Sequence, residues 1–159
     1  MLTRLRWLSC VCRRLAGATK HQFDLVSESV EILGEVFSPV VSVSLFFPRR
    51  GWLDFEFLLD TGATATILPA FIASELDLEL NQLPQVEMIG VEGSGIKSWL
   101  GEVKMRIGAR EFTTRCFFVD NPETPFLLGR ADILDRHFSL KIDGRKGKLI
   151  LIDQCDSGG

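Results

Sequence analysis

The chain has 159 residues, of which 46% are hydrophobic and 25% are charged, and its formal net charge is −3 at pH 7. This length and balance are typical of one globular domain that folds without a disulfide or a metal. The net charge gives no support to nucleic-acid binding, and no apolar run approaches the roughly 20 residues of a membrane span.

The four cysteines, Cys10, Cys12, Cys116 and Cys155, show neither an easy disulfide spacing nor zinc-ligand spacing. We therefore expect free thiols in a reducing, cytoplasmic compartment. We also expect no metal and no other cofactor.

The first 22 residues are rich in arginine, and the first acidic residue is Asp24. An acid-free, basic segment is compatible with an organellar targeting sequence, with a disordered arm, or with an over-extended gene start. The expected organisation is a basic N-terminal arm at 1–22, a folded domain at 23–153 and a flexible tail at 154–159.

The first half of the folded part predicts a hairpin followed by a helix. Apolar alternation places Leu53, Phe55, Phe57 and Leu59 on one face of a strand. Pro69 suits the first position of a helix. The expected elements are strands at 36–47, 52–59 and 65–68, a turn at 48–51, and a helix at 69–76.

The second half predicts a long hairpin with a glycine-rich tip and several short strands. A mainly β, closed sheet with one or two short helices follows from this spacing. The expected elements are hairpin strands at 85–90 and 96–107, strands at 112–119, 127–129, 138–142 and 148–152, a turn at 143–147, and a short helix at 131–134.

The most informative segment is Leu58-Leu59-Asp60-Thr61-Gly62-Ala63-Thr64. An apolar strand ends there in a carboxylate, a hydroxyl that can bond to backbone groups, and a glycine that allows close main-chain approach. Taken alone, Asp-Thr-Gly is an ordinary turn sequence.

Two further segments change this interpretation: the glycine-rich stretch from Met88 to Lys97, and Phe126-Leu127-Leu128-Gly129-Arg130. Together and in this order, the three segments resemble those of the retropepsin-like aspartic proteases over about residues 36–152. The resemblance implies a closed, β-barrel-like acid-protease half domain that acts as a homodimer on a peptide or protein substrate.

Carboxylate-based peptide hydrolysis needs two carboxyl groups that share one proton across a water molecule. The chain has one Asp-Thr-Gly, and Asp143-Gly144 lacks the preceding apolar strand and the threonine. A two-fold dimer would place Asp60 opposite its symmetry mate. We therefore expect an aspartic endopeptidase with an Asp60 dyad and an acidic pH optimum.

The resemblance also implies roles for neighbouring residues. Thr61 would bond across the dimer axis, Gly62 and Ala63 would lie against the substrate backbone, and Gly129 with Arg130 would brace the active-site loop. The acidic partner of Arg130 is left open between Asp132 and Asp135. The expected flap and substrate-binding residues are Ile89, Gly90, Val91, Gly93 and Gly95.

Plainer interpretations remain. The glycine-rich segment also fits a plain flexible hairpin, and Arg130 also fits a surface position. The competing functions are a catalytically silent, dimeric peptide-binding module with the same fold, and a half-site that works only with a different chain. Neither involves nucleic acid or a membrane span.

Overall fold

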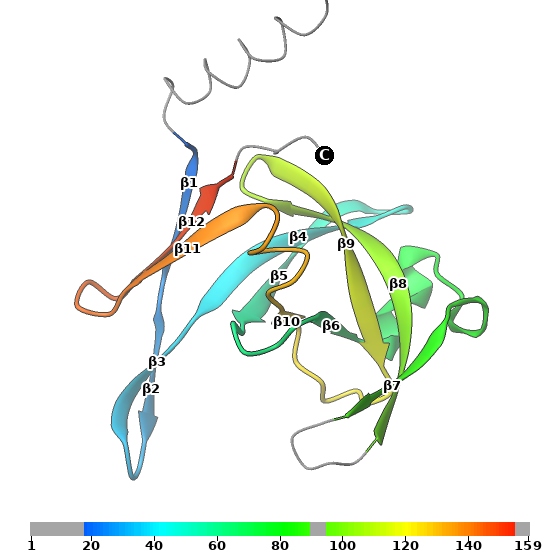
Figure 1. Ribbon diagram of the computed structural model, residues 1–159, viewed down its shortest axis with the longest axis horizontal. Helices are drawn as coiled ribbons and strands as arrows, with labels where there is room; N and C mark the ends of the chain where they lie inside the picture. The colour runs from blue at the N-terminus through cyan, green and yellow to red at the C-terminus, as the bar shows by residue number, and fades with distance from the viewer. Residues whose placement is uncertain (1–17, 90–94, 155–159) are drawn as a thin grey trace, which may run out of the picture.

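The computed structural model describes residues 18–89 and 95–154. The chain is mainly β (Figure 1). The described strands are β1 (Lys20–Asp24), β2 (Val26–Val30), β3 (Gly34–Ser38), β4 (Val40–Phe47), β5 (Gly51–Leu59), β6 (Thr66–Pro69), β7 (Gln85–Ile89), β8 (Gly95–Ile107), β9 (Arg110–Val119), β10 (Leu127–Leu128), β11 (Phe138–Asp143) and β12 (Lys148–Asp153). Three 3-10 turns are η1 (Ala70–Ile72), η2 (Ser74–Leu76) and η3 (Leu80–Gln82).

The strands form three sheets. The largest has the order β4-β5-β10-β6-β9-β8-β7, and a further pairing of β4 with β8 closes it into a ring. A second sheet, β1-β12-β11, brings the N-terminal and C-terminal strands together, and β2 pairs only with β3. The closed, mainly β architecture expected from the sequence is confirmed.

The hairpin of β4 and β5 shows why the sequence folds this way. Gly51 adopts φ +79°, a left-handed conformation that glycine tolerates, and it begins the returning strand. Phe57 and Leu59 are buried while Asp54 and Glu56 are exposed, as the alternation predicts. Buried residues from several strands and from the turns join them in one core: Val41, Val43, Leu45, Leu68, Met105, Ile107, Phe118, Leu128, Ile133, Phe138, Leu149 and Leu151.

Cys116 lies in this core as a free thiol, which confirms that expectation for the one cysteine among the described residues. Burial raises the pKa of the thiol, so that it stays protonated.

Two local expectations hold in modified form and a third was wrong. The strand expected at 36–47 is divided into β3 and β4 at Pro39, which has no N–H to donate to a ladder. The helix expected at 69–76 is the pair of 3-10 turns η1 and η2, and Asp77 ends it in a left-handed conformation with φ 56°. The helix expected at 131–134 is part of a run of turns over 131–137.

That run does not become a helix because its hydrogen bonds do not repeat. The Leu134 and Asp135 N–H groups both donate to the Arg130 carbonyl, whereas the His137 and Phe138 N–H groups both donate to the Ile133 carbonyl. An α-helix needs consecutive bonds of one spacing. The chain turns instead directly into β11.

The sequence did not predict β1 and β2. Strand β1 includes residues 20–22, which the sequence analysis placed in the N-terminal arm, and it pairs along its length with β12. His21 lies within hydrogen-bond distance of Asp153, 2.9 Å between Nε2 and Oδ1, which gives this histidine a structural role between the two strands. The part of the chain that the structure describes contains no helix that is long and apolar enough to cross a membrane.

Candidate active site

Asp60 follows the last residue of β5 and is held from two sides. Leu58 and Leu59 of β5 run parallel to Leu127 and Leu128 of β10, and the Asp60 N–H donates to the Leu128 carbonyl at 3.0 Å. On the other side, the Leu59 N–H donates to the Pro39 carbonyl at 2.8 Å. The apolar pairs in the sequence are therefore the strand ends that fix the position of this residue.

The carboxylate of Asp60 folds back onto its own loop. Its Oδ1 accepts hydrogen bonds from the N–H groups of Gly62 at 2.8 Å and Ala63 at 3.2 Å. The side chain is thus oriented by main-chain donors, and the Asp60 residue remains partly exposed to solvent. Thr61 and Gly62 beside it are exposed as well.

Gly129 and Arg130 brace this loop through their main chain. The Arg130 N–H donates to the Ala63 carbonyl at 2.9 Å, and the Gly129 N–H donates to the buried Thr66 hydroxyl at 3.2 Å. A Cβ at Gly129 would lie only 2.2 Å from the main chain of Ala65. Only a residue without a side chain can pass the loop this closely.

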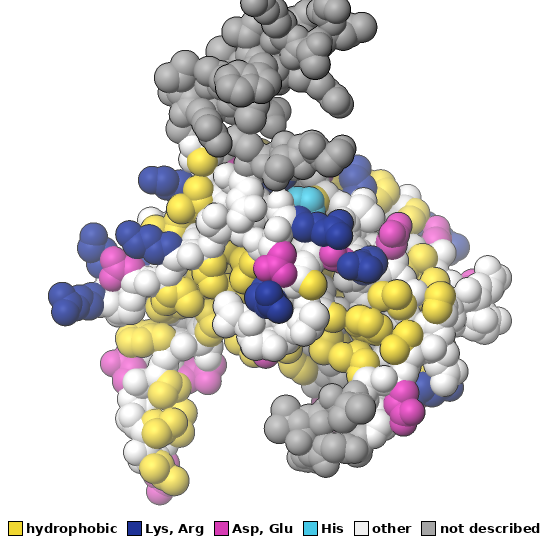
Figure 2. Space-filling view, in the orientation of Figure 1, with side chains coloured by type: hydrophobic (Ala, Val, Ile, Leu, Met, Phe, Trp, Pro, Cys, Tyr) yellow, Lys and Arg dark blue, Asp and Glu magenta, His cyan; other side chains and the backbone are white. Residues whose placement is uncertain are grey.

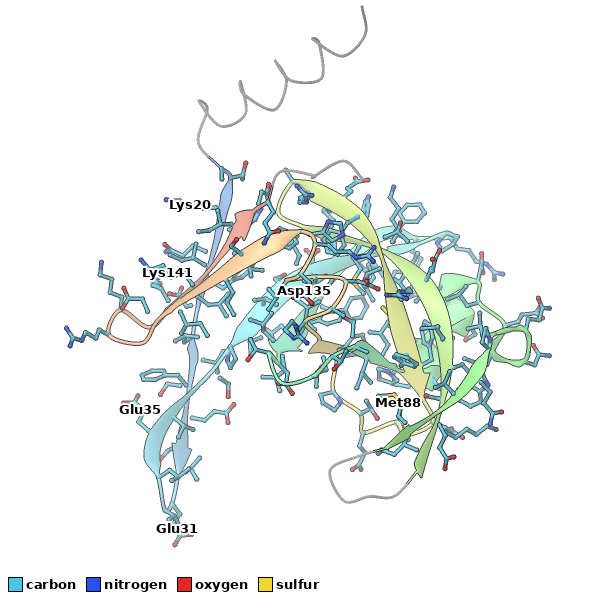
Figure 3. All side chains as sticks on the ribbon, in the orientation of Figure 1. Lys20, Glu31, Glu35, Met88, Asp135 and Lys141 are labelled. Carbon is cyan, nitrogen blue, oxygen red and sulfur yellow. The ribbon has the colours of Figure 1, made fainter. Side chains whose placement is uncertain are left out.

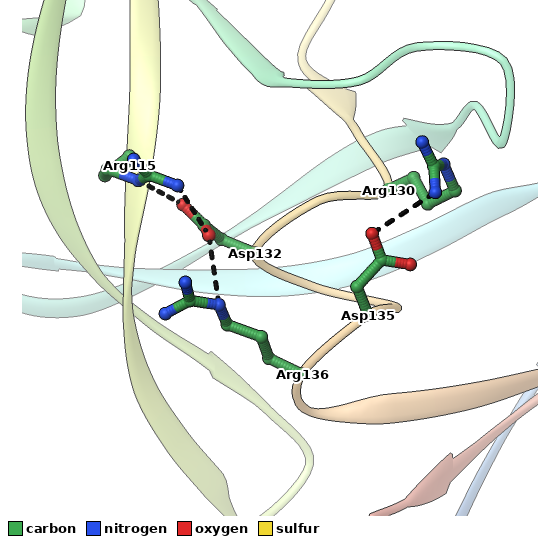
Figure 4. A network of polar contacts seen from close by, with 5 residues as sticks. All are labelled: Arg115, Arg130, Asp132, Asp135 and Arg136. Carbon is green, nitrogen blue, oxygen red and sulfur yellow. Dashed lines mark hydrogen bonds and ion pairs between the residues drawn. The ribbon is translucent and has the colours of Figure 1, made fainter. Parts of the chain in front are cut away.

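The Arg130 side chain pairs with Asp135, with Nη1 and Oδ2 3.3 Å apart and each side chain 50% exposed (Figure 4). Of the two candidate partners, the structure selects Asp135. The two side chains form a surface pair. At this position, the contact that braces the Asp60 loop is therefore made by the main-chain N–H group of Arg130.

Asp132 belongs to a different cluster, which the sequence did not predict (Figure 4). It accepts two bonds from Arg115 of β9, at 2.6 and 3.0 Å, and lies 3.3 Å from the Nε of Arg136. The Asp132 side chain is only 12% exposed. The hydrogen bond from Arg115 is the main reason that its pKa is lowered from the usual range. The sequence contains no local signal for a contact between residues 17 positions apart.

The long hairpin is present as β7 and β8. The two strands pair antiparallel from Gln85 opposite Trp99 to Ile89 opposite Gly95. The buried Ser98 hydroxyl donates to the Val86 carbonyl at 2.7 Å and ties the strands together. Gly90, Val91 and Gly93 fall outside the described residues, so their expected role stays a prediction.

The described part of the chain contains one Asp-Thr-Gly loop, that of Asp60. Two surface depressions, one of about 940 Å³ beside η1 and η2 and one of about 430 Å³ beside β1, do not include Asp60. Among the described residues, no group of three or more His, Cys, Asp or Glu side chains could hold a metal ion.

Comparisons with known proteins agree with this geometry. A family model described as gag-polyprotein putative aspartyl protease matches residues 51–136, which extend from β5 through the segment that braces the Asp60 loop. No curated protein matches the sequence.

Two solved structures are similar to the chain. A retropepsin-like aspartic protease from Rickettsia conorii is 22% identical, with 86% of this chain and 95% of that chain covered and a TM-score of 0.55. The EIAV protease complexed with the inhibitor HBY-793 is 26% identical, with 62% and 86% covered and a TM-score of 0.47. The family match spans more than half of the sequence and includes both the Asp60 loop and the Gly129 segment. The chain therefore belongs to the retropepsin-like aspartic proteases of the gag-polyprotein type.

Proposed function

We propose that this protein is an aspartic endopeptidase that acts as a homodimer, with Asp60 of each subunit forming the catalytic pair. The observation that carries the proposal is the Asp60 carboxylate, which two N–H groups orient on a loop that the Gly129 segment locks in place. A silent binding module would have no need for such a preorganised carboxylate.

In this mechanism, one carboxylate of the pair accepts a proton from water while the water oxygen attacks the scissile carbonyl carbon. The other carboxyl group, protonated at the start, donates its proton to the carbonyl oxygen. Proton transfer to the amide nitrogen then accompanies cleavage of the C–N bond. Because one carboxyl group of the pair must carry a proton, the rate is expected to peak at acidic pH.

The substrate would bind as an extended strand. Strand β7 lies at the end of the largest sheet, with β8 on one side only. Such an edge can add a peptide as a further strand, so that main-chain bonds supply affinity and alternating side-chain pockets supply selectivity. In this proposal the β7–β8 hairpin acts as a flap that closes over the peptide and excludes water.

The test is cleavage of a mixed peptide library at mildly acidic pH by the wild type and by Asp60→Asn. Loss of the catalytic carboxylate should lower the rate on the order of 10²–10⁴-fold or more. Asp77→Asn is the matched control, because Asp77 forms only an exposed ion pair with Arg49 and asparagine tolerates its left-handed conformation of φ 56°.

We expect Asp77→Asn to cleave like the wild type. Full activity in Asp60→Asn would refute the proposal. If the wild-type dimer cleaves nothing, the alternative of a peptide-binding module without turnover is favoured instead.

A further inference from the structure

Strands β2 and β3 form an arm, defined here as residues 26–38, that extends away from the body of the molecule (Figure 1). They pair only with each other, from Val26 opposite Ser38 to Val30 opposite Gly34. An isolated two-stranded hairpin is at best marginally stable in water. The arm therefore needs a surface to pack against.

The arm carries more exposed apolar surface than a solvated hairpin requires. Its exposed apolar side chains lie on both strands and at the tip: Val26 (43%), Val30 (38%), Ile32 (92%), Leu33 (73%) and Phe37 (47%). Val26 and Val30 lie on one face of the arm and Phe37 on the other, so both faces and the tip present apolar side chains. Exposed apolar side chains gathered on one projecting element mark an interaction site.

The charge of the arm is entirely acidic. Glu28, Glu31 and Glu35 are exposed, and the segment contains neither lysine nor arginine. Within the described residues, none of the three carboxylates forms an ion pair. The partner surface should therefore be apolar and basic.

The same molecule presents such a surface on the hairpin of β11 and β12. Lys141, Arg145 and Lys146 are exposed there, and Ile142 is 51% exposed. These three cations also form no ion pair within the described part of the chain. Figure 2 shows the basic side chains gathered at the left, above the yellow and magenta surface of the arm.

The two surfaces are neighbours but diverge. The Leu25 N–H donates to the Gly147 carbonyl at 2.9 Å, which joins the base of the arm to the end of the β11–β12 turn. From there the arm points downward and the β11–β12 hairpin points to the left, and Lys141 lies well apart from Glu31 in the view of Figure 3. The acidic and basic ends are therefore available to a second molecule.

A two-fold axis would use both surfaces at once. In an isologous contact, patch A of one subunit meets patch B of the other, and the reverse contact forms by symmetry.

The base of the arm is also attached to the site, because Pro39 follows β3 and accepts the Leu59 N–H next to Asp60. Strand β12 has β1 on one side and β11 on the other, so it has no free edge to pair with a second chain.

We propose that the arm of each subunit packs on the β11–β12 hairpin of a second copy of this chain. The acidic arm, with Glu28 on one face, Glu35 on the other and Glu31 at the tip, then lies beside the basic hairpin of the second copy, and its apolar residues cover the surface around Ile142 of that copy. The inference rests on the proposed function only in requiring a dimer, since half of the site comes from each copy.

The experiment uses charge reversal in the full-length chain. The arm variant is Glu28→Lys/Glu31→Lys/Glu35→Lys, and the hairpin variant is Lys141→Glu/Arg145→Glu/Lys146→Glu. Sedimentation equilibrium at low salt gives the dimer Kd, and far-UV circular dichroism checks that each variant folds. Glu123→Lys, in the loop before β10, is the control for a change of charge elsewhere.

Each variant alone should raise the dimer Kd at least tenfold, because both reciprocal contacts become repulsive. An equimolar mixture of the two variants should restore the wild-type Kd, because both contacts in the mixed dimer are attractive again. Added salt should weaken the wild-type dimer by screening the charges. Glu123→Lys should dimerise like the wild type.

Unchanged dimerisation of both variants would overturn the inference. It would also be overturned if the dimer Kd recovered only when all six substitutions were in one chain, because that result indicates a contact within the chain. Peptide cleavage is measured separately. A dimer that requires the arm but cleaves nothing would refute the protease and leave the arm contact standing. If the dimer cleaves peptides and the arm variant dimerises like the wild type, the arm contact is refuted and the protease proposal stands.

Discussion

Gly62 and Gly129 differ in how strictly the space around them requires a glycine. Neither Gly62 nor Gly129 has a positive φ. A Cβ at Gly62 would lie 3.2 Å from Oδ1 of Asp60, and a Cβ at Gly129 would lie 2.2 Å from the main chain of Ala65. The first neighbour is a side-chain oxygen and the second is backbone, which cannot move without displacing the Asp60 loop.

Gly129→Ala should therefore destabilise the protein strongly. Overpacking typically costs about 1–3 kcal/mol, and we expect at least the upper end of that range because the clash is with main chain. Urea unfolding of the variant measures the change. Gly144→Ala is the control, because its added Cβ would meet nothing within 4 Å. Equal stability of the two variants would contradict this account.

The sequence predicted that the Asp60 loop and the Gly129 segment belong to one site, and the structure brings these two segments into contact, while their catalytic roles stay a prediction. The residues Asp60 to Ala63 and the Gly129 segment are recognisable because each role depends on residue type at adjacent positions. The Arg115 contact with Asp132 was not predictable, since it depends on how β9 lies beside the turns after β10. The role of Arg130 was assigned to its side chain, whereas the structure shows bracing by its N–H group.

At the scale of elements, the alternation of apolar and polar residues predicted the strands that bury one face. Strands β4, β5, β8 and β9 each bury one face, which leaves a period-two pattern in the sequence. Strands β2 and β3 bury little, so Val-Ser-Glu-Ser-Val carried no comparable signal. The segment 131–137 is too short for local propensity to impose a helix against the start of β11.

The Asp132 cluster links β9 to these turns, and it should make stability depend on pH. The pKa of Asp132 is lowered, mainly by its hydrogen bond with Arg115, so the folded state favours the ionised carboxylate. The stabilisation is complete above the unfolded-state pKa of about 4 and is lost as the pH falls through the lower folded-state pKa.

Asp132→Asn should therefore be less stable than the wild type near neutral pH, and the difference should shrink as the solution is acidified below pH 4. Thermal unfolding across this pH range tests the sign. Asp135→Asn is the control, since its pair with Arg130 is half exposed and such surface pairs contribute about 0–1 kcal/mol. A difference for Asp132→Asn that grows on acidification would refute the assignment.

At the scale of the whole molecule, the proposed mechanism requires more than one chain. The described residues contain one Asp-Thr-Gly loop, which contributes one carboxylate, and the proposed chemistry needs two. The arm and the β11–β12 hairpin lie outside the closed sheet of seven strands. The sheet that holds Asp60 is thus distinct from the two hairpins that the proposed dimer would use.

A mixture of wild type and Asp60→Asn should reveal the shared site. Each mixed dimer has one Asp60, so it cannot supply the proton-sharing pair. At equal amounts and random exchange, about one quarter of the dimers hold two Asp60 residues, and the activity should fall to about that fraction of an all-wild-type sample at the same total concentration. The control mixes wild type with Asp77→Asn, which should leave activity unchanged. Activity that falls only to one half would mean that each chain works independently, with a complete site of its own.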